Sequence, residues 1–115
     1  MLTDFSKGSE LQSLSFIPDT LTVTINVETV VKFQRVLGFR VLNESDLLEF
    51  WPACSATNGA LFEILDGGWL SQESARPGFV SKSQAGVLKE YLLSGPENCV
   101  NVLAFENPRV TSRAL

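Results

Sequence analysis

The sequence contains no histidine, and this absence excludes more chemistry than any single residue that is present suggests. Without an imidazole there is no Ser-His-Asp or Cys-His nucleophile pair, and the commonest general base at neutral pH is missing. Zinc, copper and non-haem iron sites that use histidine are excluded, and two cysteines are too few for an all-thiolate zinc site. We therefore expect no metal and no cofactor, and any catalysis would depend on carboxylates, a thiol, a lysine or a tyrosine.

Long apolar runs and closely spaced cysteines are lacking as well. No uninterrupted apolar stretch approaches the roughly 20 residues that cross a bilayer, and the opening residues, MLTDFSKGSELQ, lack the regions of a signal peptide. Cys54 and Cys99 lie 45 positions apart, so we expect buried or idle thiols in a reducing compartment. These absences predict a cytoplasmic protein that does not bind membranes.

Positive charge is missing from one segment of the chain. Between Val41 and Ala75 there are six acidic residues and no lysine or arginine, whereas the rest of the chain has seven acids and nine bases. The formal charge of −4 therefore arises in this acidic segment. Nucleic-acid-binding proteins carry the opposite charge, so we expect a cationic small molecule or a basic protein as partner. The alternative is a solvated acidic face that only maintains solubility.

The 115 residues are enough for one hydrophobic core and predict a single domain over residues 1–115, in which residues 1–14 form a loose N-terminal arm. Alternating apolar and polar residues predict a strand at Leu21–Val27, and ALFEIL (60–65) predicts another. ESDLLEFW (44–51) fits a strand or a short helical turn before Pro52, and Phe50 and Trp51 favour the strand. WLSQES (69–74) is also predicted as a strand. VLKEYLL (87–93) and CVNVLAF (99–105) are predicted to form a β-hairpin around the turn SGPEN.

ETVVKFQRVLGFRVL, residues 28–42, fits either a long strand or a helix followed by a strand. One strand over residues 21–41 would far exceed the usual 3 to 10 residues. Val30, Val31, Phe33 and Leu37 form a helical stripe, and Gly38 is suited to ending a helix. The sequence thus predicts an α+β fold: mostly antiparallel sheet with one main helix at about 28–37, a βαβββ-like first half and β-hairpins in the second half.

This predicted order, together with INVETVVKFQRVLGFRVL, resembles the glyoxalase and bleomycin-resistance (vicinal oxygen chelate) superfamily over residues 21–42. Phe33, Leu37, Gly38 and Phe39 match a family pattern that ends a helix, whereas Gln34 departs from the family's tyrosine. The positions that hold metal ligands in metal-dependent members offer no such set here. The resemblance therefore implies the metal-free branch, whose members bind a ligand in a cleft, often as homodimers.

These observations support two leading functions and a third, carboxylate-dependent catalysis. The first is a non-catalytic binding protein that sequesters a cationic or aromatic small molecule in an acidic cleft with tryptophan walls. The second is an acidic inhibitor or immunity-type protein that neutralises a basic protein, and it takes precedence if residues 28–37 are extended. Acids that converge on a pocket would favour the first function, and acids spread over a surface the second. The candidate site residues are Asp46, Glu49, Trp51, Glu63, Asp66, Trp69 and Glu73.

Overall fold

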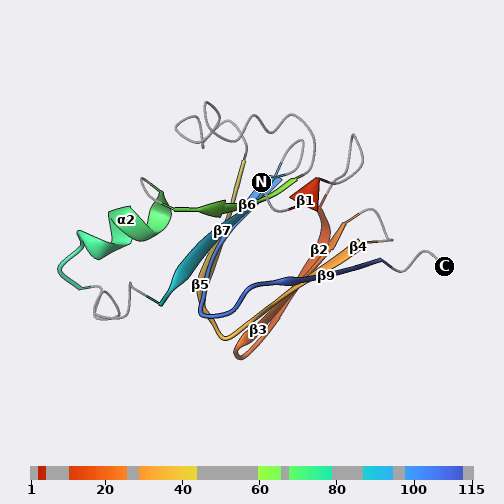
Figure 1. The fold of residues 1–115 in the computed structure, drawn as a ribbon, viewed down its shortest axis with the longest axis horizontal. Helices are drawn as coiled ribbons and strands as arrows, with labels where there is room; N and C mark the ends of the chain where they lie inside the picture. Colours follow the sequence, from red (N-terminus) through yellow and green to blue (C-terminus); the bar gives the residue numbers. More distant parts are fainter. Residues whose placement is uncertain are drawn as a thin grey trace.

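The computed structural model describes residues 3–4, 11–25, 29–43, 60–65, 68–78, 87–94 and 98–112. Within these residues the protein is mostly antiparallel β-structure in two sheets, with one short helix (Figure 1). Sheet A has the strand order β1-β6-β7-β8-β5, formed by β1 (Thr3–Asp4), β6 (Ala60–Ile64), β7 (Lys89–Ser94), β8 (Asn98–Ala104) and β5 (Val36–Asn43). Sheet B has the order β2-β3-β4-β9, formed by β2 (Leu11–Ile17), β3 (Thr20–Ile25), β4 (Thr29–Gln34) and β9 (Arg109–Ser112).

The predicted helix over residues 28–37 is wrong, because this part of the chain forms β4 and β5. In β4 the burial alternates: Val31 and Phe33 are fully buried, whereas Lys32 and Gln34 are exposed. Pairing with β3 on one side and β9 on the other satisfies the backbone of β4, and the β-branched run that begins the strand suits this position. The first half of the chain is therefore not a βαβββ unit, although the prediction of mostly antiparallel sheet is confirmed.

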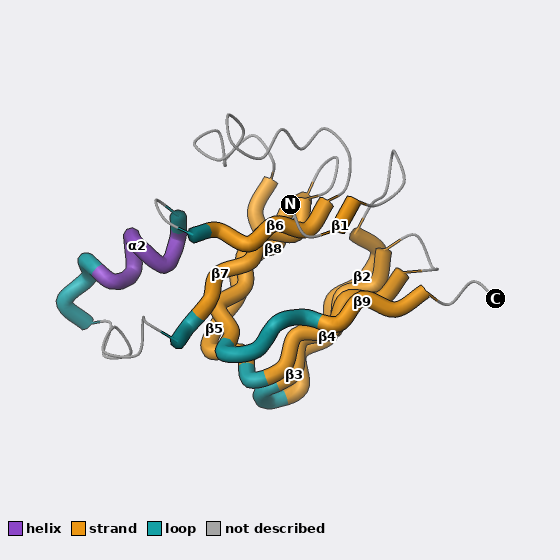
Figure 2. The backbone as a smooth tube through the Cα atoms, viewed as in Figure 1, coloured by secondary structure: helices purple, strands orange, loops and turns teal. Residues whose placement is uncertain are grey.

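A bend at Arg35 carries the chain from sheet B into sheet A. Arg35 has a positive φ of 55°, and its carbonyl oxygen accepts a hydrogen bond from the Phe105 N–H at 3.1 Å. β4 and β5 thus form one bent ribbon that pairs with β9 and β8, so this ribbon runs through both sheets (Figure 2). Gly38, predicted to end a helix, instead lies where the register of β5 shifts against β8.

The hairpin of β2 and β3 turns at Pro18-Asp19. Proline fixes φ near −65° at the first loop position, and Asp19 has a φ of 81°, which together match a type II turn. The Asp19 carbonyl oxygen accepts a hydrogen bond from the Val36 N–H at 3.1 Å, so this turn is tied to the start of β5. Residues 11–14, predicted as part of a loose arm, are the first part of β2.

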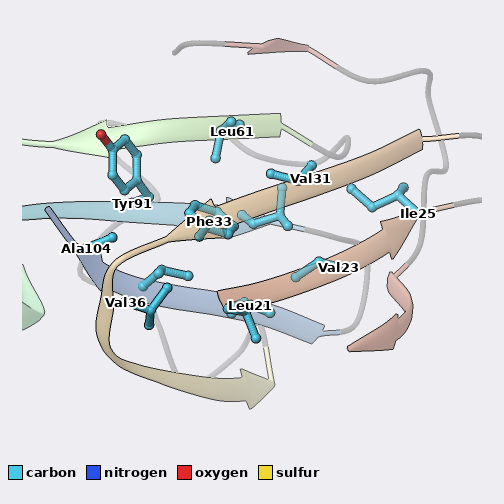
Figure 3. Packing of buried hydrophobic residues seen from close by; sticks show 12 residues of the cluster. Leu21, Val23, Ile25, Val31, Phe33, Val36, Leu61, Tyr91 and Ala104 are labelled. Carbon is cyan, nitrogen blue, oxygen red and sulfur yellow. The ribbon is translucent and has the colours of Figure 1, made fainter. Parts of the chain in front are cut away.

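The main core lies between the two sheets. Leu21, Val23, Val31 and Phe33 project from sheet B against inward-facing residues of sheet A, among them Leu61, Tyr91, Leu93, Val100 and Val102 (Figure 3). Full burial of each such side chain contributes about 1.5–3 kcal/mol. Cys99 is buried as predicted, on β8, and Cys54 lies outside the described residues.

Several other predicted elements can be compared with the structure. The strands at 21–27 and 60–65 are confirmed as β3 and β6, and the predicted hairpin is confirmed as β7 and β8. WLSQES is not a strand: it forms helix α2 (Trp69–Ser74), which lies near β6 and β7, away from sheet B (Figure 1). The strand predicted within residues 44–51 lies outside the described residues. Among the described residues, no helix has the length and apolar character needed to span a membrane.

Candidate functional site

Sheet A separates the predicted site residues that the structure describes. Glu63 on β6 pairs directly with Tyr91, so it shares the inner face of the sheet with the main core. Trp69 and Glu73 belong to α2, which packs on the outer face beside Leu88 and Leu103. Glu63 and Trp69 therefore do not line a common cleft. The remaining candidates, Asp46, Glu49, Trp51 and Asp66, lie outside the described residues.

Glu63 lies next to a buried phenol. Burial, and in second place the Glu63 charge, raise the pKa of Tyr91 to about 12, so its hydroxyl is neutral at physiological pH. That hydroxyl donates a hydrogen bond to the side-chain oxygen of Asn107, which also accepts one from Lys89 Nζ at 3.0 Å. These bonds tie the β8–β9 connection to β7, which is a structural role.

Trp69 and Glu73 form a small cluster with two arginines. The Arg40 guanidinium carbon lies 4.9 Å from the centroid of the Trp69 ring, and the indole N–H donates to Glu73 Oε1 at 3.3 Å. Arg76 pairs with Glu73 at 2.8 Å, and the hydrogen bond from Arg76 lowers the pKa of Glu73. Both the aromatic face and the carboxylate are thus already in contact with cations of the chain itself.

A buried carboxylate that the sequence analysis missed holds α2 on sheet A. Glu90 is only 1 % exposed, and its two oxygens accept hydrogen bonds from the backbone N–H groups of Trp69 at 2.9 Å and Leu70 at 2.8 Å. The Asn101 amide donates to Glu90 Oε2 at 3.5 Å, and Asn101 Oδ1 accepts from Arg40 Nε at 3.0 Å. The pattern that could have identified this buried carboxylate is in VLKEYLL, where Glu90 shares its strand face with Leu88 and Leu92.

The buried position of Glu90 predicts a pH dependence of stability. Burial, the largest effect, raises the pKa of Glu90 above 4.5, although the backbone hydrogen bonds from Leu70 and Trp69 oppose it. Since the folded-state pKa is raised, this residue's contribution to stability is present below the unfolded pKa and is lost as pH rises through the folded pKa. Urea unfolding from pH 4 to 7.5 should show this loss in the wild type, and Glu90→Gln should remove it.

Glu73→Gln is the control for that measurement. The pKa of Glu73 is lowered, so its stabilising contribution is lost in the opposite direction, as pH falls. The difference between this variant and the wild type should therefore change with pH with the opposite sign. A Glu90→Gln protein with the wild-type pH profile would contradict the assigned role of Glu90.

β2 and β5 are terminal strands of the two described sheets and are not paired with each other. We call the boundary between these two strands the seam. At one end of this seam the rings of Phe16 and Phe39 are in contact, with centroids 5.2 Å apart. Beyond them, the hydrogen bond from Val36 to Asp19 joins the sheets. At the other end a pocket of about 230 Å³ opens, which we call the seam pocket.

The seam pocket has an apolar interior and neutral polar groups. Val23 and Val100 are fully buried at its base, whereas Val41 is 49 % exposed. The other described residues of its lining are Leu11, Gln12, Ser13, Leu14 and Asn98. Among the described residues, no charged side chain lines it. This pocket was not predicted from the sequence, because residues 11–14 were expected to form a loose arm and the ligand was expected among the acids.

Comparison of the chain with protein-family models, with curated proteins and with solved structures finds no match in any of the three. The described part of the chain also holds no group of three or more acidic, cysteine or histidine side chains that could bind a metal ion. A functional assignment must therefore come from the geometry of the chain itself, and within the described residues the seam pocket and the contacts of α2 are the two distinctive sites.

Proposed function

We propose that this protein is a non-catalytic small-molecule-binding protein and that its ligand is neutral and mainly apolar. The observation that carries the proposal is the seam pocket of about 230 Å³, lined by apolar and neutral polar residues from β2, β3, β5 and β8. A dry apolar cavity of roughly 150 Å³ in a protein core accepts benzene, so this pocket has room for a larger ring system or a short hydrocarbon chain. Ligand pockets of small proteins are typically apolar with a few polar groups that orient the ligand.

The lining determines the class of ligand. A charged group that enters an apolar pocket without a partner loses its hydration, which disfavours binding strongly. Gln12, Ser13 and Asn98 can instead exchange hydrogen bonds with a hydroxyl, carbonyl or amide of the ligand. The aromatic ligand expected from the sequence fits this chemistry, whereas the described lining residues do not favour the cationic one.

The proposal rests on the pocket and not on the resemblance to the glyoxalase superfamily. Residues 29–34 and 36–43 are extended, so the Leu37-Gly38-Phe39 triplet has no helix to end. Glu63 and Trp69 lie on opposite faces of sheet A, so these two residues do not support an acidic, tryptophan-walled cleft.

Three naphthalene compounds of similar size test the ligand class. The neutral probe 2-naphthol has about 11 non-hydrogen atoms, and at about 0.5 kcal/mol per atom it should bind with a Kd on the order of 0.1 mM. Anionic 2-naphthoate and cationic 2-naphthylmethylammonium should bind at least about tenfold more weakly, because the described lining of the pocket offers no opposite charge. Titration followed by NMR would give the three affinities. Preferential binding of the cation would favour the acidic cleft instead.

A matched pair of valine variants locates the binding site. Val41→Phe fills the mouth of the seam pocket and should weaken 2-naphthol binding at least about tenfold, because Val41 is half exposed and a larger ring can occupy the pocket. Val110→Phe places the same change on β9, at a residue that is 38 % exposed and outside the pocket lining, and should leave the affinity unchanged. Equal affinities of the two variants for 2-naphthol would mean that the probe binds outside the seam pocket.

A second candidate function is an acidic inhibitor of a basic protein. The extended residues 29–34 and 36–37 favour it over the acidic cleft expected from the sequence, and it ranks below ligand binding only because of the seam pocket. The other observation that favours it is the placement of Glu63 and Glu73 on opposite sides of sheet A, since acids that do not converge on one pocket suit a protein partner better than a small ligand. A pull-down from the source organism should then recover a basic protein, and high salt should weaken the recovery. Recovery that is insensitive to salt would remove the electrostatic basis of this function. Formation of a homodimer remains a prediction from the resemblance alone.

A further inference from the structure

We propose that α2 is a brace for the wall of the seam pocket: through Arg40 it holds the terminal strand β5 in place and thereby sets the affinity of the pocket for its ligand. This inference rests on the ligand-binding function proposed above. It concerns residues that lie on the far side of sheet A from the ligand and belong to no pocket lining.

β5 is the strand of the pocket wall that most needs support. In the described sheet it is terminal and pairs with β8 only, and its register shifts between Val36 and Gly38. Its inward-facing residues are incompletely covered, with Val41 49 % exposed, because the sheets separate at the seam. A strand with hydrogen bonds along one edge and few buried side chains opens locally at a lower free energy than a central strand.

The outer face of β5 carries a closed ring of contacts that includes α2. The Glu90 carboxylate holds the backbone of Trp69 and contacts the Asn101 amide, Asn101 accepts a hydrogen bond from Arg40, and Arg40 lies over the Trp69 ring. The ring of Trp69 also reaches β5 at Gly38, where an added Cβ would lie 3.8 Å from its Cη2 atom. The Arg40 side chain of β5 thus takes part in a ring of contacts that links this strand to α2, β7 and β8.

The register of sheet A connects this ring to the pocket. Arg40 pairs with Asn101, and the next pair along the same two strands is Val41 with Val100. Because successive side chains of a strand point to opposite faces, the first pair faces α2 and the second lines the seam pocket. Movement of β5 away from β8 at Arg40 would therefore move Val41, which forms one lip of the pocket.

The first experiment measures 2-naphthol affinity in arginine variants. Arg40→Ala should raise the Kd about fivefold to tenfold, the range of a modest coupling between sites, and Arg40→Lys, which keeps a cation over Trp69, should stay within about twofold of the wild type. Arg109→Ala is the matched control, since the Arg109 side chain is exposed on β9 and makes no ion pair or hydrogen bond within the described residues; this variant should bind as the wild type does. An unchanged Kd in Arg40→Ala overturns the brace.

A spectroscopic signal separates coupling from a general loss of structure. With 5-fluorotryptophan incorporated, the 19F resonance of Trp69 can be assigned by Trp51→Phe, because these are the two tryptophans of the chain. Saturation with 2-naphthol should shift the Trp69 resonance although Trp69 lies on the opposite face of sheet A, and Arg40→Ala should abolish the shift. A Trp69 resonance that stays fixed in the saturated wild type contradicts the inference.

Hydrogen exchange tests the brace without any ligand. Arg40→Ala should speed exchange of the β5 amides that bond to β8 by about fivefold or more, while the amides of β3 keep their wild-type rates. If 2-naphthol fails to bind the wild type but exchange in β5 responds, the proposed ligand is wrong and the brace stands as a property of β5. Unchanged exchange in β5 refutes the brace whether or not the probe binds.

Discussion

Replacing Phe33 with alanine should lower the free energy of unfolding by about 3–5 kcal/mol, the largest effect we expect from a single substitution in this protein. The Phe33 side chain is fully buried between the sheets, and its ring centroid lies 5.8 Å from that of Tyr91. Alanine would leave a cavity that the two paired strands beside β4 cannot close, since both are fixed by backbone hydrogen bonds. Urea unfolding monitored by circular dichroism would measure the loss.

Leu37→Ala is the informative control for this prediction, because a helix over residues 28–37 would place Leu37 on the same buried stripe as Phe33. In the bent ribbon Leu37 is 41 % exposed, and its truncation should cost less than about 1.5 kcal/mol. A similar cost for Phe33→Ala and Leu37→Ala would favour the helix and contradict the strands β4 and β5.

Replacing Gly68 with alanine should detach α2 from sheet A and lower the free energy of unfolding by about 1–3 kcal/mol. A Cβ atom at this position would lie 2.6 Å from Glu90 Oε2, 2.8 Å from Glu90 Oε1 and 2.7 Å from Ile64 Cγ2. The carboxylate cannot withdraw, because it is buried and holds the N–H groups of Trp69 and Leu70. The 19F resonance of Trp69 should move toward that of a solvent-exposed indole.

Gly78→Ala makes the same chemical change at an exposed glycine. The nearest atom to the added Cβ is Arg76 Nη1 at 3.1 Å, the end of a long side chain that can move aside. Its stability and its Trp69 resonance should match the wild type. Should Gly68→Ala behave like Gly78→Ala, the close packing of Gly68 against Glu90 would be refuted.

Part of the fold could be predicted from the sequence, because in those segments the local residue pattern agrees with the burial of the residues in the folded protein. ALFEIL and the hairpin of β7 and β8 were predicted, since each run is apolar, rich in strand-forming residues and bounded by turn residues. The Pro18-Asp19 turn was overlooked although its residue types mark a turn between two alternating runs. Glu90 and Asn101 were overlooked as well, and each is a polar residue on an otherwise apolar strand face.

Other features depend on contacts that no local pattern contains. WLSQES resembles a strand partner for β6, yet it is helical because its first N–H groups meet the carboxylate of Glu90, 20 or 21 positions away in the chain. The seam pocket likewise combines residues of β2 and β8 that are more than 80 positions apart. Neither the partner of an N–H group nor the gap between two sheets is encoded in a short stretch.

The segment that forms β4 and β5 shows the limit of prediction from the sequence alone. By itself the sequence determined that a histidine-free chain of this size forms mostly antiparallel sheet, because the alternation and β-branched residues of its strongest segments permit little else. Only the tertiary structure decided that residues 29–43 form two strands joined at Arg35, which has a positive φ. The spacing of Val31, Phe33 and Leu37 is compatible with one face of a helix and also with one face of a strand. Pairing with β3, β9 and β8 resolved the ambiguity, because those long-range hydrogen bonds bury Val31 and Phe33 together and leave Leu37 exposed.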